Sequence, residues 1–345
     1  MRKRTGDHDS VEQKTDGNKT KVSLSAQPRP SPHLLWWFKR GLLAVCVIYV
    51  SVPFMMPLFP DIIKHLVYSH RVRVPFFVDH SQPADLSLNH TMNMYLTSEQ
   101  GISLGVWHTV PERQWKEAQG KDLEWYQDSL GAGNPIIIYL HGNGGTRAAS
   151  HRVGLINLLS AMDYHVLALD YRGFGDSTGE PTEVGITTDT LYLYQWVKAR
   201  SGSSLVVLWG HSLGTGVATN TAVKLMEHAV TNRIKITATP TATKMCFRNC
   251  SESLRLTVHE SDVSPCLYSL KRMRSPLLIL HAEDDHVVPI HMAQQLYEIA
   301  QSAQNSENRV KMVPFARSLG YLHNGLYKDP HMPNIIGEFV HSLPP

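Results

Sequence analysis

Apolar runs of strand length alternate with longer segments of mixed polarity along most of the chain. Two stretches of alternating polarity, residues 91–98 and 102–110, flank a Glu-Gln-Gly turn and predict a β-hairpin. From residue 136 onward the short runs are apolar throughout, which is typical of strands covered on both faces. The sequence therefore predicts an α/β fold over residues 91–345, with a mostly parallel central sheet and helices on both faces. The expected strands are 136–140, 165–170, 204–210, 276–282 and 310–315, and the expected helices are 122–130, 147–161, 184–200, 212–228, 291–304 and 333–342.

A different pattern precedes this region. Residues 41–60 contain no charged side chain, and a helix of that length spans roughly 30 Å, the thickness of the hydrocarbon core of a bilayer. Basic residues precede the run and Asp61 follows it. Prolines within the run favour a kinked or shortened helix, so a buried core helix or an interfacial segment is the alternative. We predict a single transmembrane helix over residues 41–60.

Net charge is distributed unevenly over the 345 residues. The chain carries 33 Lys and Arg against 30 Asp and Glu, a formal charge of +3. Residues 1–40 hold nine basic and four acidic side chains, a net charge of +5, which leaves −2 for the rest. Positive charge favours the cytosolic side of a membrane, so we expect a disordered cytosolic tail over residues 1–40. The rest of the chain beyond residue 60 is then lumenal or extracellular.

Residues beyond the apolar run fit this orientation. Residues 61–90 mix apolar and basic side chains, and we expect them to form a linker or a segment at the membrane surface. The tripeptide beginning at Asn89 is an N-glycosylation sequon, so we predict a glycan at Asn89. The body shows neither zinc-finger spacing nor basic residues interleaved with aromatic ones, and we expect no nucleic-acid binding.

The motif Gly210-His211-Ser212-Leu213-Gly214 follows an apolar run and opens a helical stretch. A serine between glycines on a strand-to-helix turn is typical of a nucleophile elbow. The adjacent helix N-terminus favours developing negative charge. We predict that Ser212 is a nucleophile; the alternative is a tight turn with a structural serine.

An oxyanion hole is expected after an earlier strand. His141-Gly142-Asn143-Gly144-Gly145 directly follows the strand predicted over residues 136–140. Glycines let main-chain N–H groups approach a reacting carbonyl, and we expect the N–H groups of Asn143 and Leu213 to be the donors. The alternative is a Gly-rich turn or a phosphate cradle, but the spacing matches neither a P-loop nor a dinucleotide-binding fingerprint.

An acid and a base should follow the late strands. We predict Asp285, which follows the run at 276–282, as the acid, with Asp284 as its rival. His323 follows the last predicted strand and is the expected base. The chain order is then serine, aspartate, histidine, the order of a nucleophile elbow with its two partners. We find no metal-ligand spacing, and we expect no metal and no cofactor.

These motifs in this order resemble the α/β-hydrolase superfamily. Within it, the sequence is similar to the membrane-anchored abhydrolase-domain lipases of lysophosphatidylserine and monoacylglycerol, through YLHGN, DYRGFGDS, WGHSLGTGVATN and LLILHAEDD. The resemblance implies the α/β-hydrolase fold, a triad of Ser212, Asp285 and His323, and lysophospholipid and monoacylglycerol substrates. It also implies a single-pass protein, most simply of the endoplasmic reticulum membrane, with a lumenal body. A peptidase or a thioesterase of the same fold is the alternative.

Residues 231–268 depart from the family pattern. The family has an apolar strand here, then a Glu-Ser-Pro-Phe turn and an aromatic-rich cap, whereas this stretch holds three of the four cysteines. The missing strand lies between the strand of the nucleophile and the strand of the acid. If residues 234–239 (IKITAT) do not replace it, the acid and base lose their register with Ser212. A catalytically impaired form that acts only by binding is therefore a second alternative.

Overall fold

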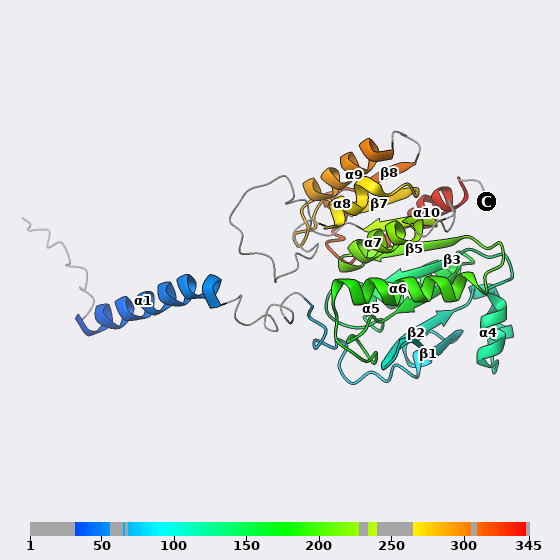
Figure 1. The fold of residues 1–345 in the computed structure, drawn as a ribbon, viewed down its shortest axis with the longest axis horizontal. Coiled ribbons are helices and arrows are strands. Elements are labelled where there is room, and N and C mark those ends of the chain that lie inside the picture. The colour runs from blue at the N-terminus through cyan, green and yellow to red at the C-terminus, as the bar shows by residue number, and fades with distance from the viewer. Residues whose placement is uncertain are drawn as a thin grey trace, which may run out of the picture. The chain divides into compact units, whose positions relative to one another are not determined.

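The computed structural model describes residues 32–55, 65, 68–227, 234–239, 265–304 and 309–342. The chain divides into two units, residues 1–55 and residues 56–345 (Figure 1). Three features discussed from the sequence lie outside the described residues: most of the cytosolic tail, the end of the predicted anchor at residues 56–60, and residues 240–264 of the stretch that departs from the family pattern.

The helix of the first unit is α1 (Pro32–Met55). It begins upstream of the predicted start at Gly41, because lysine and arginine are good helix formers and the guanidinium of Arg40 lies 4.1 Å from the ring centroid of Trp36, one turn earlier. Many of its apolar side chains are exposed, with Tyr49 at 81%. Within the described part of the chain, we find no helix that combines the length and the apolar character needed to cross a membrane.

The strands described in the second unit form one eight-stranded sheet, in the order β1-β2-β4-β3-β5-β6-β7-β8. The first two strands form the predicted hairpin, β2 pairs antiparallel with β4, and all the other pairs are parallel. The predicted mostly parallel sheet is thus confirmed. The strands are β1 (Thr91–Glu99), β2 (Ile102–Thr109), β3 (Ile136–Leu140), β4 (His165–Leu169), β5 (Val206–His211), β6 (Ile234–Thr239), β7 (Leu277–Ala282) and β8 (Val310–Phe315).

Helices cover both faces of this sheet (Figure 1). Alternate residues of β3 point to opposite faces, so Ile138 belongs to one buried apolar cluster and Tyr139 to the other. The first cluster includes residues of α6 (Glu183–Lys198), α7 (Leu213–Glu227), α8 (Pro265–Arg272) and α9 (Ile290–Gln304), and the second includes residues of α5 (Ser150–Ala161) and α10 (Met332–His341). Shorter elements are η2 (Pro83–Leu86), η3 (Glu112–Gln114), α3 (Trp115–Ala118), α4 (Leu123–Ser129), η4 (Arg317–Leu319) and η5 (Leu326–Lys328).

The stretch that departs from the family pattern supplies β6. Its backbone pairs with β5 from Val206↔Ile234 to His211↔Thr239, and with β7 at Ile236↔Leu277. The IKITAT segment therefore occupies the place between the nucleophile strand and the acid strand. The sheet is continuous there, so the loss of register considered from the sequence does not occur.

The parallel strands end at one edge of the sheet. Leu140 lies opposite Gly210 across β3 and β5, and Ala282 lies opposite Phe315 across β7 and β8. Loops that follow the carboxyl ends of parallel strands meet at this edge, where open α/β sheets place their ligand sites. The Ser212 turn, the loop over residues 141–145, Asp285 and His323 all lie at or just after the ends of these strands.

Candidate active site

Ser212 stands on a sharp turn between β5 and α7. Its φ of 57° lies in the left-handed region, which a non-glycine residue seldom adopts. The two flanking glycines leave no room for side chains. A Cβ on Gly214 would meet the carbonyl of Leu140, and a Cβ on Gly210 would meet the backbone of Gly214. The turn therefore has the geometry of a nucleophile elbow.

His323 bridges the serine and an aspartate. Its Nδ1 lies 2.7 Å from Oδ2 of Asp285, and its Nε2 lies 3.2 Å from Oγ of Ser212. Because a carboxylate only accepts hydrogen bonds, Nδ1 carries the proton and Nε2 can accept the serine hydroxyl proton. Asp284 instead accepts the backbone N–H of Leu322 at 3.1 Å. The structure thus brings together the three predicted side chains and leaves the rival acid outside.

The carboxylate of Asp285 is held in its ionised form. Burial by itself raises its pKa, but the hydrogen bond to His323 and those from the N–H groups of Val288 and Val287 outweigh burial. The two backbone donors reach Oδ1 at 2.9 and 2.8 Å, which leaves Oδ2 for the imidazole. The pKa of Asp285 therefore lies below its ordinary value.

The predicted oxyanion loop lies against the serine. A Cβ built on Gly142 would be 2.8 Å from Cβ of Ser212, so only glycine fits there. The Oδ1 of Asn143 accepts the N–H groups of Ser69 at 2.9 Å and of Gly144 at 3.0 Å, which ties the loop down. Leu213 is the first residue of α7, and N–H groups in the first turn of a helix have no partner within the helix.

Sequence reasoning missed two buried arginines around this loop. Arg147 pairs with Asp170 at 2.7 Å and with Asp176 at 2.6 Å. Arg152 directs its guanidinium to main-chain carbonyls of the loop. The sequence carries a signal for them. Residues 146–152 (TRAASHR) place both arginines at the start of the helix predicted over residues 147–161, which must bury one face against the sheet.

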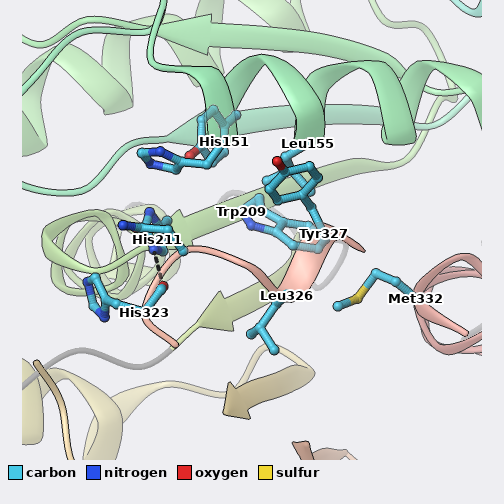
Figure 2. A pocket seen from close by; sticks show the side chains of 10 residues that line it. His151, Leu155, Trp209, His211, His323, Leu326, Tyr327 and Met332 are labelled. Carbon is cyan, nitrogen blue, oxygen red and sulfur yellow. Dashed lines mark hydrogen bonds between the residues drawn. The ribbon is translucent and has the colours of Figure 1, made fainter. Parts of the chain in front are cut away.

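A small pocket lies behind the histidine, with a volume of about 30 Å³, on the order of one or two water molecules. Figure 2 shows His211 between His151 and His323, with its Nε2 on the carbonyl of His323 at 3.2 Å. Three buried nitrogens in this wall, His151 Nε2, His211 Nδ1 and Trp209 Nε1, have no hydrogen-bond partner among the described residues. The pocket is lined by Tyr139, His151, Leu155, Trp209, His211, His323, Asn324, Leu326, Tyr327 and Met332.

Two of these histidines, His151 and His211, have lowered pKa values and are neutral at physiological pH. Burial, followed by the nearby Arg152, lowers the pKa of His151 to about 4. Burial, and then the charges of His323, His151 and Arg152, hold the pKa of His211 well below its ordinary value. A neutral His211 donates from Nε2 to the carbonyl of His323 and so fixes the backbone at His323. Among the described residues, no group of His, Cys, Asp and Glu gathers as metal ligands do.

Comparison with known proteins agrees with this geometry. A family profile described as alpha/beta hydrolase fold matches residues 135–246. Lysophosphatidylserine lipase ABHD12 of Danio rerio is 41% identical over 333 residues, covering 90% of this chain and 86% of that protein. The protein of the same name from Rattus norvegicus is 42% identical over 334 residues, with 90% and 82% covered. Protein ABHD12B of Homo sapiens is 43% identical over 324 residues, with 90% and 88% covered.

Solved structures show the same fold at lower identity. The Pyrococcus furiosus esterase Pf2001 is 20% identical, with a TM-score of 0.56, and covers 79% of this chain and 97% of its own. An alpha-beta hydrolase from Vibrio vulnificus is 14% identical, with a TM-score of 0.56, and covers 80% and 92%. The resemblance inferred from the motifs is confirmed: the chain belongs to the α/β-hydrolase family, as a relative of the ABHD12 lysophosphatidylserine lipases, and is a hydrolase of that fold.

Proposed function

We propose that this chain is a serine hydrolase that cleaves lipid esters, with Ser212 as nucleophile, His323 as general base and Asp285 as the group that orients the imidazole. The observation that carries the proposal is the pair of contacts of His323, 2.7 Å to Asp285 and 3.2 Å to Ser212. Nucleophile, base and orienting acid within hydrogen-bond reach are the parts that acyl transfer requires. The family membership supports the same reaction class.

The geometry supports a two-step reaction. His323 takes the hydroxyl proton as Oγ of Ser212 attacks the ester carbonyl, and the N–H groups of Asn143 and Leu213 stabilise the tetrahedral oxyanion. His323 then gives the proton to the departing alcohol, which leaves an acyl-enzyme. Water then loses a proton to His323 and attacks the acyl carbonyl. The ester bond to Oγ breaks, the fatty acid leaves, and His323 returns the proton to Oγ, which regenerates Ser212.

Lysophospholipids are the substrates we propose, because relatives of this chain are named lysophosphatidylserine lipases. We propose monoacylglycerols as well, on the motif resemblance alone. The surface beside the site supports a lipid. A loop over residues 71–78 is joined to the oxyanion loop by the N–H of Gly145 on the carbonyl of Val72 at 2.7 Å. It exposes apolar side chains to solvent: Val72, Val74, Phe76 and Phe77. An exposed apolar surface next to the oxyanion loop favours substrates with acyl chains over peptides.

We also propose that residues 41–60 attach the protein to a membrane, with a cytosolic N-terminus and a lumenal body in the endoplasmic reticulum. The uncharged run and the exposed apolar side chains of α1 support attachment. The positive tail supports the orientation. Asn89 is exposed, as a glycan attachment site must be.

A fluorophosphonate probe tests the proposal on the full-length protein in detergent. We expect labelling that is lost in Ser212→Ala, and hydrolysis of lysophosphatidylserine and monoacylglycerol in preference to a peptide ester or a thioester. Labelling combined with faster turnover of the peptide ester or the thioester would support the alternative within this fold. Folded wild-type protein that is not labelled would leave only the form that acts by binding.

A further inference from the structure

Beneath the oxyanion loop lies a buried cation with main-chain partners. Arg152, on the first turn of α5, is 3% exposed. Its Nη2 donates to the carbonyls of Gly142 at 3.1 Å and Gly144 at 2.7 Å, and its Nη1 donates to the carbonyl of Thr146 at 2.9 Å. One guanidinium therefore collects three alternate carbonyls of the loop.

No ion pair joins Arg152 to a carboxylate within the described part of the chain, in contrast to Arg147 with its two aspartates. Burying a charge without a counterion is costly, and peptide dipoles aimed at it offset part of that cost. Arg152 thus draws the carbonyls of the loop inward. Its position on α5, which packs against the sheet, fixes where those carbonyls point.

Each carbonyl held in this way sets the direction of one N–H group. In a planar trans peptide, the carbonyl of one residue and the N–H of the next point in opposite directions. The peptide between Gly144 and Gly145 shows this arrangement, since its carbonyl faces Arg152 and its N–H donates outward to the carbonyl of Val72 at 2.7 Å. The carbonyls of Gly142, Gly144 and Thr146 thus face Arg152, and the N–H group that follows Gly144 points to the other side.

The same rule applies to the peptide between Gly142 and Asn143, which supplies the proposed oxyanion donor. The carbonyl of Gly142 accepts two hydrogen bonds, from Arg152 Nη2 at 3.1 Å and from His141 Nδ1 at 2.7 Å. The N–H of Asn143 must point away from both donors. Hydrogen bonds to a carbonyl also polarise its amide and strengthen the N–H as a donor.

We propose that Arg152 is a positioning residue for the oxyanion hole: its guanidinium fixes and polarises the peptide whose Asn143 N–H faces the developing oxyanion. Arg152 touches no substrate and acts through the backbone. The inference rests on the proposed function, since it concerns the transition state of the Ser212 reaction. It assigns a role to the buried guanidinium of Arg152, which takes no part in the proton transfers of the triad.

The test compares Arg152→Lys and Arg152→Met with wild-type protein, at equal active-site concentration. Removing a whole oxyanion donor costs about 100- to 1,000-fold in kcat, so a misdirected donor should cost less. We expect kcat to fall about 10-fold for the lysine variant, whose point charge cannot serve three carbonyls, and about 100-fold for the methionine variant. KM should stay within about 3-fold, because the ground-state ester makes little use of the oxyanion hole.

Two inhibitors distinguish a misplaced oxyanion donor from a general distortion of the site. A trifluoromethyl ketone forms a tetrahedral adduct whose oxyanion occupies the hole, so its Ki should rise by the same factor by which kcat/KM falls. The matching methyl ketone, which binds without forming the adduct, should bind all variants alike. Arg172→Lys is the control, because Arg172 is paired with Asp189 and Glu99 rather than with loop carbonyls, and it should leave both inhibitor constants unchanged.

The outcomes are distinguishable. A lysine variant with wild-type kcat and Ki overturns the positioning role, as does a lysine variant that fails to fold, which would assign Arg152 to stability alone. An equal loss in binding of both ketones would also overturn it. Wild-type protein that hydrolyses no ester is a failure of the proposed function instead, and is recognised before any variant is compared.

Discussion

The Oδ2 of Asp285 lies 2.7 Å from the Nδ1 of His323. The neighbouring Asp284 has the same side chain, but it accepts the backbone N–H of Leu322. Two adjacent aspartates thus have different partners, one the imidazole itself and the other the backbone of its loop. Because only the first contact sets the tautomer of the base, the two residues should differ sharply in their effect on the reaction.

Replacing Asp285 by asparagine should lower kcat by about 1,000- to 10,000-fold, because an amide stabilises the wrong imidazole tautomer. Asp284→Asn is the matched control and should cost less than about 10-fold, since the asparagine Oδ1 can still accept the backbone N–H of Leu322. Steady-state kinetics on a short-chain ester measure both. Equal losses for the two variants would show that the structure identifies the wrong acid.

The fold, and the meeting of Ser212, Asp285 and His323 at one place, could be predicted because each follows a local pattern. Ser212 lies between glycines after an apolar run and His323 follows the last strand, so a local motif and the order along the chain select them. Arg152 could not be found in that way. Its three partners are main-chain carbonyls, and only the folded path of the loop brings them to one side chain. Residues 234–239 were doubted because their composition departs from the family, yet backbone pairing between two strong strands requires little from side chains.

The IKITAT strand gives a prediction about activity. Ile236 pairs with Leu208 of β5 on one side and with Leu277 of β7 on the other. Proline there removes a ladder hydrogen bond from a central strand and leaves its partner unpaired, so Ile236→Pro should lower the free energy of unfolding by about 1–3 kcal/mol. Fluorophosphonate labelling of Ser212 should fall with it. The control is Ile236→Val, which suits a strand and should keep both stability and labelling. Full labelling of the proline variant would show that β6 does not connect the nucleophile to the acid.

The exposed loop over residues 71–78 should matter only for substrates in a bilayer. Phe76 and Phe77 are 66% and 106% exposed, and burying one such side chain in an apolar phase is worth about 1.5–3 kcal/mol. Replacing both by serine should lower hydrolysis of monoacylglycerol in vesicles by about 10-fold and leave a water-soluble short-chain ester unaffected. Leu123→Ser, at an exposed apolar position of α4, is the control and should change neither rate. Equal losses on both substrates would argue against contact of the loop with lipid.

Orientation in the membrane can be read from glycosylation. If the body is lumenal, Asn89 is exposed to the glycosylation machinery, and protein expressed in eukaryotic cells should lose apparent mass on endoglycosidase treatment. Asn89→Gln should remove that part of the shift. Asn249 heads a second sequon, outside the described residues, so Asn249→Gln is the companion variant and the double variant should show no shift. Unmodified wild-type protein, or a shift that survives the double variant, contradicts the proposed orientation.

Acid should destabilise the fold through buried neutral histidines. Nε2 of His108 lies 3.1 Å from Nδ1 of His165 between β2 and β4, and both side chains are fully buried. Burial, and then the charge of Arg113, lower the pKa of His165 from 6.5 to about 4. As the pH falls, His165 is therefore protonated in the unfolded chain before it is protonated in the folded protein. The stabilisation is complete above pH 6.5 and is lost as the pH falls towards 4, at about 1 kcal/mol per pH unit for this group.

Urea unfolding at a series of pH values measures this slope. His165→Gln removes the titrating group, so the slope between pH 6.5 and 4.5 should fall by about one proton, while the slope above pH 7 should match that of wild-type protein. The variant also loses the contact with His108, which lowers stability at every pH without changing the slope assigned to His165. An unchanged slope in the variant would mean that His165 is already protonated in the folded protein near pH 6. The buried pair would then hold a charge whose burial costs free energy, offset in part by a hydrogen bond to the backbone of Ser129.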